Sequence, residues 1–468
     1  MRVSEENRQQ LKWQRLLWTG PLCFACTLVV LVALFSLSSL LPSSLLKRNV
    51  LASAEQMQKE GMFYQIKTYD RRSEIHNYAD AVTLNIMMQI GGEGTLQEIL
   101  KSPMYSRSGS FYTPTPDLLF ESVSQDLPAD AVYDRYWHGM AMVLRPLFLF
   151  LELKQIRILF VAVLLGLLAL LSVQLWNCRL KGAVCFLWIS ALLVQLPMVG
   201  LCVEYFPVWV VMLLSSFAVL HRWDSSRTLC YVFIINGVSC AFFDFLTTET
   251  VAVVLPLALL VLLKKQNGKL GQMWTEVKNL LGYGLLWGVS YLGAFFTKWL
   301  LSGMVHGQER ISVALSSFWD RQGAVAANTA IDSLYQGTFV RTSLEAAGGE
   351  HLPQMFSAVL INIRLLCGLS GKVSLEEMAL IVLGIVLVMA GFAYLYRKQR
   401  EELTQGYLLL LLGMAPVARM MVMNNHSLEH CFFVYRSLFA TIFCFGVGVY
   451  SIVNWKYFKY KRGGKMKK

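Results

Sequence analysis

The feature that most constrains this chain is a polar segment, residues 42–157, set among apolar stretches long enough to cross a bilayer. Hydrophobic residues make up 55% of the chain, and uncharged runs of about 18 or more residues recur along it. We therefore expect about ten transmembrane helices, within a range of about nine to twelve. The clearest runs are residues 16–41, 182–203, 378–396 and 437–455.

These segments are expected to be helices because every backbone amide in hydrocarbon needs an internal partner. Strands of a membrane barrel would alternate polar and apolar residues, and these runs do not. The predicted fold is an all-α polytopic membrane bundle with two large extracytoplasmic loops that carry amphipathic helices. A bundle of this kind is one structural unit, whatever its length.

The distribution of basic residues predicts the orientation. About half of the 42 Lys and Arg residues lie in the termini and in short loops on one side, whereas the short turns on the other side hold none. The positive-inside rule then places both termini in the cytoplasm, in what we expect to be a bacterial plasma membrane. The net charge of +12 is thus topology information and does not indicate nucleic-acid binding.

This topology divides the chain into seven predicted parts. They are a cytoplasmic N-terminus (1–15), a first transmembrane helix kept as a signal anchor (16–41), a large extracytoplasmic loop (42–157), transmembrane helices two to seven (158–305), a second extracytoplasmic loop (306–375), transmembrane helices eight to ten (376–455) and a basic cytoplasmic tail (456–468).

Amphipathic helices are expected in both large loops. In the first loop they cover 51–63, 78–90 and 139–153. In the second, residues 355–370 have Arg364 at their centre, which favours an interfacial or re-entrant helix over a membrane span.

Ionisable residues inside or at the ends of the predicted spans gather toward the outer side. A charge within a span costs several kcal/mol unless it is paired, so such residues mark a functional site by default. One interpretation is mutual pairing between the acids and the arginines; the other is that the cations bind a phosphate, for which the arginine fork is suited. The residues are Asp244, Glu249, Lys298, Arg419 and Arg436.

The first outer loop holds the candidate general bases and a candidate sugar-binding segment. Asp70 and Asp80 are the candidate bases; on a helix His76 would share a face with Asp80, which is the favoured base. Aromatic residues with a histidine and an arginine follow in Trp137, His138 and Arg145. Such a set suits a sugar, whose apolar face stacks on rings, and it equally suits an aromatic belt.

The segment from His426 to His430 matches the pattern H-x-x-E-H, which in some proteases binds zinc. No acid follows in the rest of the chain, so the further carboxylate ligand of a zinc site is missing. We interpret both histidines as part of a polar rim that contacts the sugar or the acceptor, and we expect no metal ligand set. The need for a divalent cation stays open.

In layout, the chain resembles the GT-C superfamily of membrane glycosyltransferases. The resemblance rests on the cytoplasmic N-terminus, the first span that leads into a large outer loop, the bundle of about ten helices and the second outer loop after the seventh span. It implies a polyprenyl-phosphate-linked sugar as donor, a glycan or lipid acceptor, and direct displacement assisted by a carboxylate. Asp70 or Asp80 would be the base, and Arg436, Arg419 or Lys298 would bind the donor phosphate. Asp244, Glu249, His426 and His430 would then contact the sugar or the acceptor.

Two other functions stay open from the sequence. A polysaccharide polymerase or ligase of the cell envelope also combines an outer loop with arginine and histidine in the membrane. A transporter or a non-catalytic assembly protein is the other alternative, although the halves of the chain show no internal repeat of the kind on which alternating access usually rests. The sugar and the acceptor are not identified.

Overall fold

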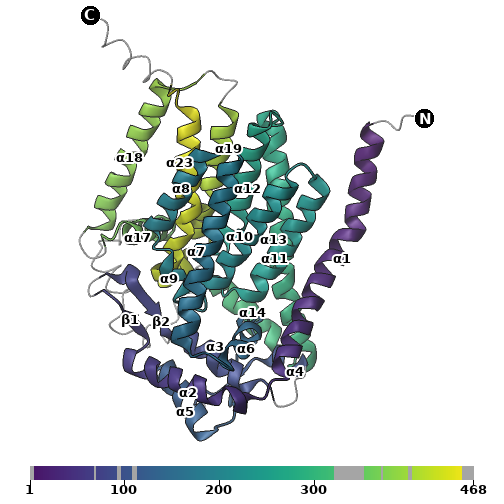
Figure 1. Ribbon diagram of the computed structural model, residues 1–468, viewed down its shortest axis with the longest axis vertical. Coiled ribbons are helices and arrows are strands. Elements are labelled where there is room, and N and C mark those ends of the chain that lie inside the picture. The colour runs from purple at the N-terminus through teal and green to yellow at the C-terminus, as the bar shows by residue number, and fades with distance from the viewer. Residues whose placement is uncertain are drawn as a thin grey trace, which may run out of the picture.

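The computed structural model describes residues 5–67, 70–91, 96–107, 113–320, 353–369, 373–398 and 403–455. Within these ranges the chain is almost entirely helical, with two small two-stranded sheets. Figure 1 shows upright helices above a layer of shorter elements. The predicted class of a helical membrane protein is confirmed at this level.

Seven helical segments in the described chain are long and apolar enough to cross a bilayer. The predicted count of about ten is not reached by these segments alone and stays a prediction. The seven are Trp18–Ser39 in α1 (Glu5–Ser39), α7 (Leu153–Asn177), α11 (Ser226–Phe243), α13 (Met273–His306), α18 (Leu375–Leu395), Thr404–Val422 and Cys431–Ile452.

The last two of these segments are broken into shorter helices. Thr404–Val422 comprises α19 (Thr404–Gly413) and α20 (Ala415–Val422), with Pro416 at the start of α20. A short helix, α21 (Asn424–Glu429), follows at the turn. The final segment comprises α22 (Cys431–Val434), η4 (Tyr435–Ser437) and α23 (Leu438–Ile452).

Shorter apolar helices fill the bundle between the long ones. They are α8 (Lys181–Leu193), α9 (Pro197–Gly200), α10 (Phe206–Arg222) and α12 (Thr250–Gln266). In α12 every residue from Thr250 to Leu263 is buried, and the helix packs against α10, α19 and α23. A helix that is apolar on all sides belongs in the interior, so α12 is the central helix of the bundle.

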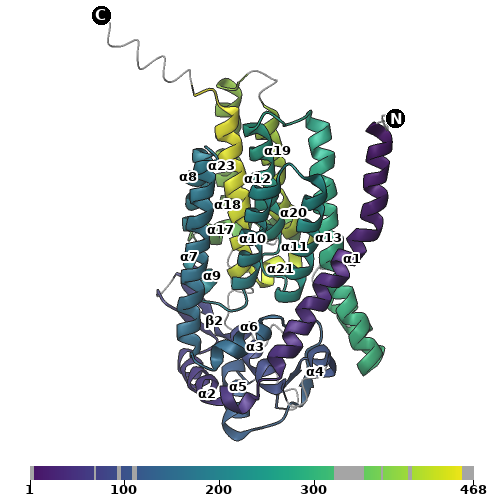
Figure 2. The same cartoon turned by 45° about the vertical axis from the view of Figure 1, so that its right-hand side comes forward.

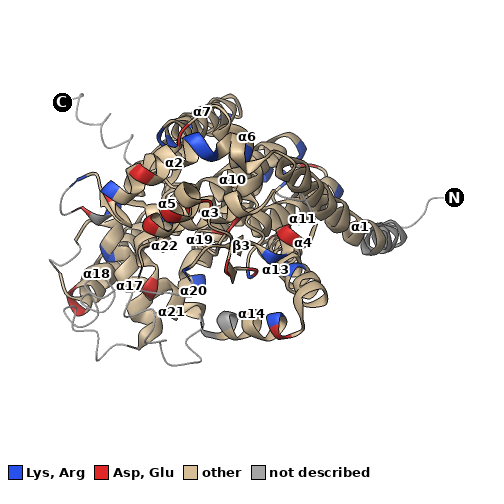
Figure 3. Ribbon diagram, turned by 90° about the horizontal axis from the view of Figure 1, so that it is seen from below, with Lys and Arg blue, Asp and Glu red and all other residues tan. Residues whose placement is uncertain are grey.

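A polar domain, defined here as the described part of residues 42–152, lies at one end of the bundle. Figures 1 and 2 both show it opposite the end at which α1 begins and α23 stops. Seen from that end, both acidic and basic residues are spread across the molecule (Figure 3). Its elements are α2 (Ser43–Glu60), β1 (Phe63–Gln65), η1 (Arg71–Ser73), β2 (Glu74–His76), α3 (Asn77–Gln89), α4 (Leu96–Lys101), β3 (Pro103–Met104), α5 (Thr115–Gln125), β4 (Ala131–Val132) and α6 (Met140–Phe148).

Helices thus occur at the three places expected in the first outer loop, in α2, α3 and α6. The segment predicted as the second outer loop contains α14 (Glu309–Asp320) and α17 (Gln354–Leu366), and its residues 321–352 and 370–372 lie outside the described residues. With 13 residues, α17 is about 20 Å long, shorter than a bilayer core of about 30 Å. Its Arg364 is buried and donates a hydrogen bond to the Val373 carbonyl.

Arg145 fastens the polar domain to the first long helix. Its side chain is fully buried and donates hydrogen bonds to the carbonyls of Ser38 in the last turn of α1, of Leu41 after that helix, and of Met87 and Ile90 at the end of α3. Carbonyls at helix ends lack the usual intrahelical donor, and Arg145 donates to them; the Ser38 carbonyl also accepts from the Leu41 amide. Burial lowers the pKa of Arg145 to about 10, so the guanidinium is still charged at neutral pH. The residue predicted to contact a sugar therefore caps two helices.

Replacing Arg145 with methionine should lower the free energy of unfolding by about 3–5 kcal/mol, because several buried carbonyls lose their partner. The expected readout is a large drop in the melting temperature of the purified protein in detergent. The exposed Arg48 is the matched control, and Arg48→Met should leave the melting temperature unchanged. Equal melting temperatures for the two variants would contradict this role of Arg145.

Candidate active site

The β1–β2 hairpin and α3 bring His76 to the junction between the polar domain and the bundle. The strands pair antiparallel with Phe63 opposite His76, and Ser73 closes the connecting turn by donating a hydrogen bond to the Asp70 carbonyl. β2 continues directly into α3, so His76 occupies the position before the first turn of that helix. The position of His76 is therefore fixed by the hairpin before it and by α3 after it.

His76 forms a close pair with Glu204, which stands in the turn before α10. Nδ1 of His76 lies 2.9 Å from Oε2 of Glu204, and the two side chains are 5% and 8% exposed. The other ring nitrogen, Nε2, is buried and has no hydrogen-bond partner among the described residues. The pair thus leaves one imidazole nitrogen unused inside the protein.

Aromatic side chains enclose the His76 ring. Phe63 and Tyr205 stack on it with ring centroids 5.2 and 6.1 Å away, and Phe432 meets it edge-on at 4.9 Å. Tyr78 also lies nearly parallel to the ring, and burial raises the pKa of Tyr78 to about 12. These rings come from the hairpin, from α3, from the turn before α10 and from α22, so the site lies where four parts of the chain meet.

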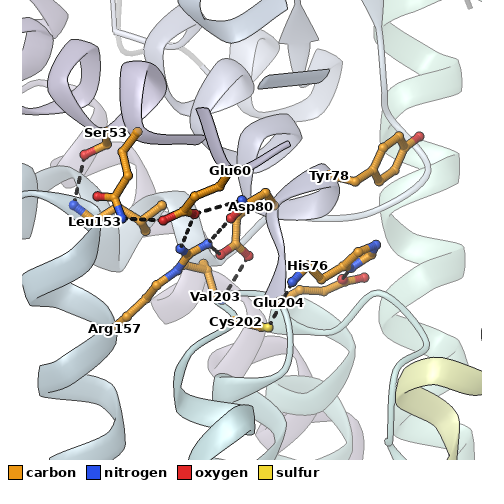
Figure 4. A network of polar contacts seen from close by, with 12 residues as sticks. Ser53, Glu60, His76, Tyr78, Asp80, Leu153, Arg157, Cys202, Val203 and Glu204 are labelled. Atoms are coloured by element: carbon orange, nitrogen blue, oxygen red, sulfur yellow. Dashed lines mark hydrogen bonds and ion pairs between the residues drawn. The ribbon is translucent and has the colours of Figure 1, made fainter. Parts of the chain in front are cut away.

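Asp80 lies one helical turn beyond His76 and forms a buried ion pair with Arg157 of α7. The closest nitrogen and oxygen of this pair are 2.7 Å apart, and the side chains are 4% and 0% exposed for Arg157 and Asp80. The Asn77 side-chain oxygen also accepts from Arg157 at 2.7 Å, and Glu60 lies 3.9 Å from the same guanidinium. Figure 4 shows this network beside the His76–Glu204 pair.

The second oxygen of Asp80 accepts a hydrogen bond of 3.0 Å from the Val203 backbone amide. Val203 precedes Glu204, so one carboxylate holds both the helix that follows His76 and the turn that carries its partner. Asp80, predicted as the general base, has both oxygens occupied and no exposed surface. These contacts favour a structural role for Asp80 over a role in proton transfer.

Asp70, the other predicted base, is paired with Arg72. Its oxygens lie 3.0 and 3.1 Å from two nitrogens of that guanidinium, and the side chain is 24% exposed. Hydrogen bonds from Arg72 lower the pKa of Asp70, so this carboxylate is fully ionised at neutral pH. An ionised carboxylate that is held in this way is a weak proton acceptor.

Arg436 is the most isolated cation of the site. It is 2% exposed, it donates to the carbonyls of Phe432 and Arg72, and its carbon centre lies 5.4 Å from the Tyr205 ring. No carboxylate of the described residues lies within ion-pair distance of it, and its Nε is buried without a partner. The hydroxyl of neighbouring Tyr435 also lacks a partner among the described residues. A buried charge of this kind calls for an anion.

Arg419 of α20 belongs to a second cluster, which lies against the loop between α11 and α12. It binds Glu249 at 2.7 Å and the carbonyl of Leu246, and Ser427 and His426 lie 3.1 and 3.4 Å from its other nitrogens. Leu246 has a φ of +64°, which is costly for a leucine and is retained here by the hydrogen bond from Arg419. The predicted acid–arginine pairing is therefore present between Glu249 and Arg419.

The two predicted rim histidines connect these clusters. The rings of His426 and His430 are 4.6 Å apart, and His430 stacks on Phe433 at 5.3 Å. Phe433 in turn lies 6.3 Å from the His76 ring. A continuous line of rings therefore joins Arg419 to His76. In the described residues no group of three or more histidines, cysteines or acids is placed to hold a metal ion.

Three other predicted residues lie apart from His76, where α13 meets the polar domain. Lys298 is fully buried, and its Nζ donates to the Ile99 carbonyl at 2.7 Å. Trp137 donates to the Ala294 carbonyl and lies 5.4 Å from the Lys298 nitrogen. Nε2 of His138 contacts the Tyr133 carbonyl, and burial lowers the pKa of His138 to about 3, so its ring is neutral. These contacts join elements of the fold.

Asp244 caps the end of α11. One oxygen accepts from the backbone and the hydroxyl of Thr247, and the other accepts from Tyr291. Burial and the nearby Glu249 raise the pKa of Asp244 to about 7. Asp244 thus shapes the loop that presents Glu249 to Arg419.

Glu204, Arg157 and Tyr435 are site residues that sequence reasoning did not single out. Glu204 is the one acid in the short turn between the apolar runs 182–203 and 205–220, which is a usable signal. Arg157 stands in the first turn of an apolar helix, where it resembles an ordinary flanking residue. Searches with family models, with curated proteins and with solved structures find no match for this chain.

Removing either charge of the Asp80–Arg157 pair should destabilise the protein by about 3–5 kcal/mol, because the remaining charge stays buried and unpaired. The double variant Asp80→Leu with Arg157→Met should be more stable than either single variant. Unfolding in detergent, followed by heat or denaturant, measures all three.

The exposed pair Lys47–Asp126 is the matched control for this cycle. Its side chains are 32% and 77% exposed, so its removal should cost less than about 1 kcal/mol. Single variants at Asp80 and Arg157 that were as stable as the Lys47→Ala variant would contradict the anchoring interpretation.

Proposed function

We propose that this protein is a membrane glycosyltransferase that moves a sugar from a polyprenyl-phosphate donor to a hydroxyl acceptor. The reaction takes place at the end of the bundle that carries the polar domain. The observation that carries the proposal is Arg436, a buried guanidinium with no carboxylate of the described residues within ion-pair distance. Its natural partner is an anionic group supplied by a substrate, and a phosphate fits the arginine fork.

A long apolar groove supports a lipid as the substrate that carries this phosphate. The groove has a volume of about 1130 Å³ and is lined almost wholly by apolar side chains of α12, α13, α18, α19 and α23. Its lining includes Val253, one helical turn from Glu249, and Ala415, one turn from Arg419. The apolar lining suits the hydrocarbon chain of a lipid, and at these two residues it comes within one helical turn of the Glu249–Arg419 cluster.

The proposal includes a topology of ten transmembrane helices. The seven long segments and the shorter α8, α10 and α12 make up this number. An even number agrees with α1 beginning and α23 ending at the same end of the bundle (Figure 1). With the basic loops in the cytoplasm of a bacterium, the polar domain and the site face outward.

The proposed reaction is a direct displacement at the anomeric carbon. The acceptor oxygen forms the new bond to the sugar, the bond to the donor phosphate breaks, and polyprenyl phosphate leaves with the bonding electrons. Because the leaving group is already a stable anion, the protein supplies orientation and positive charge. Arg436 provides that charge in water-poor surroundings, where it acts most strongly.

The test is to reconstitute the purified protein in lipid with polyprenyl-phosphate sugars and to measure released polyprenyl phosphate. Arg436→Ala should lower kcat/KM by about 100-fold or more, and Arg436→Lys should lower it less. Arg222→Ala changes an exposed arginine at the opposite end and should have no effect. Flux of solute into vesicles without any release would instead favour transport.

The groove makes a second prediction. Ala390 lines it, so Ala390→Trp should raise KM for a long-chain donor and leave a short-chain, water-soluble analogue unaffected. Leu380→Trp places the same ring on an exposed position of α18 outside the groove lining and is the control. Equal KM values for the long donor in both variants would contradict binding of the lipid chain in the groove.

A further inference from the structure

The His76–Glu204 pair is the part of the site that the proposed function has not used. A glutamate 2.9 Å from Nδ1 accepts a hydrogen bond from that nitrogen, so the proton of the neutral ring stays on Nδ1. The lone pair is then on Nε2. Buried polar atoms nearly always have a partner, and leaving one without costs about 1–3 kcal/mol. Nε2 of His76 is such an atom among the described residues.

The geometry points to His76 as the general base of this enzyme, and we infer that its Nε2 removes the proton from the acceptor hydroxyl. This inference rests on the proposed glycosyl transfer and names the group that activates its acceptor. In the step, the acceptor O–H bond gives its proton to Nε2 while the oxygen attacks the anomeric carbon. The donor C–O bond breaks at the same time, and Glu204 stabilises the imidazolium that forms.

The neighbouring acids are less suited to this step. Asp80 uses both oxygens for Arg157 and the Val203 amide, and it has no exposed surface. Asp70 is held by Arg72, which favours its ionised form. An imidazole that a carboxylate orients, and whose other nitrogen has no partner among the described residues, is better placed to accept a proton than either of them.

Asp80 acts on the reaction as a positioning residue. It fixes the amide of Val203, the residue before Glu204, and it lies on α3 one turn from His76. The His76 backbone amide also donates to the thiol of Cys202 at 3.4 Å, which ties the same two segments together. The ion pair with Arg157 therefore sets the separation between His76 and Glu204.

The acceptor enters between rings contributed by different parts of the fold. Phe63 comes from the hairpin and Phe432 from α22, and their centroids are 5.9 Å apart beside His76. These side chains keep the ring 4% exposed in the structure.

The experiment compares wild type, His76→Ala, His76→Gln and Glu204→Gln in the polyprenyl phosphate release assay across pH. Loss of the base should lower kcat by about 10²–10⁴-fold with a smaller change in KM. Added imidazole should restore part of the activity of His76→Ala, because it can fill the space left by the ring, and it should not restore His76→Gln. His221→Ala, at an exposed histidine, is the control.

Glu204→Gln tests the His76–Glu204 pair through the pH profile of kcat. A purely structural role of the pair would leave the shape of that profile unchanged. The charged and titratable groups that face His76 are Glu204, Tyr78, Tyr205, Cys202 and Asp80, with Arg436 beyond Tyr205. Removing the negative charge of Glu204 disfavours the imidazolium, so the acid limb of the kcat profile should move to lower pH by about one unit. The maximum kcat of the Glu204→Gln variant should also be lower than that of wild type.

The outcomes separate the two proposals. If wild-type protein releases no polyprenyl phosphate, the glycosyl transfer and the role of His76 both fail. If wild type is active and His76→Ala keeps the wild-type kcat, or if its lost activity is not restored by imidazole and the Glu204→Gln profile is unshifted, the role of His76 alone is overturned. Restored activity together with the shifted profile supports it.

Discussion

The Asp80–Arg157 ion pair is the interaction on which the arrangement of this molecule depends. It joins the polar domain to the first helix that follows it, with both side chains almost fully shielded from water. Burying two charges costs several kcal/mol each, and hydrogen bonds with Asn77 and the Val203 amide, together with the nearby Glu60, offset part of this cost, although Arg157 Nε has no partner among the described residues. Such a contact tolerates little displacement, so it fixes the polar domain relative to the bundle.

Much of the bundle could be predicted from the sequence, because long uncharged runs in a bilayer have no alternative to helix. Charges placed near the same end of different spans also made pairing between the acids and the arginines one of two interpretations, and Glu249 and Arg419 do form such a pair. Periodicity likewise located helices in the first loop. It could not show that Arg145 caps two helices, because its acceptors are backbone carbonyls, which no side-chain pattern records.

The base that we propose could not be predicted from the sequence for a related reason. His76 and Asp80 lie one turn apart, and an acid in an outer loop is the more familiar base. What distinguishes them is the partner of each: Arg157 is 77 residues beyond Asp80, and Glu204 is 128 residues beyond His76. Only the packed structure shows that the carboxylate is saturated and that the imidazole keeps a free nitrogen. At this site, the atoms that have no hydrogen-bond partner are the ones available to a substrate.

Three of the buried atoms that lack a partner among the described residues belong to this site. Nε2 of His76 is a proton acceptor, Nε of Arg436 is a cationic donor, and the hydroxyl of Tyr435 offers both functions; all three are buried and without partners among the described residues. If their part were only to stabilise the fold, each would carry an uncompensated desolvation cost of about 1–3 kcal/mol. Transfer of a group from a phosphate to a hydroxyl needs a proton acceptor for the nucleophile and a cation for the leaving anion. The proposed reaction assigns these two functions to the unused atoms of His76 and Arg436.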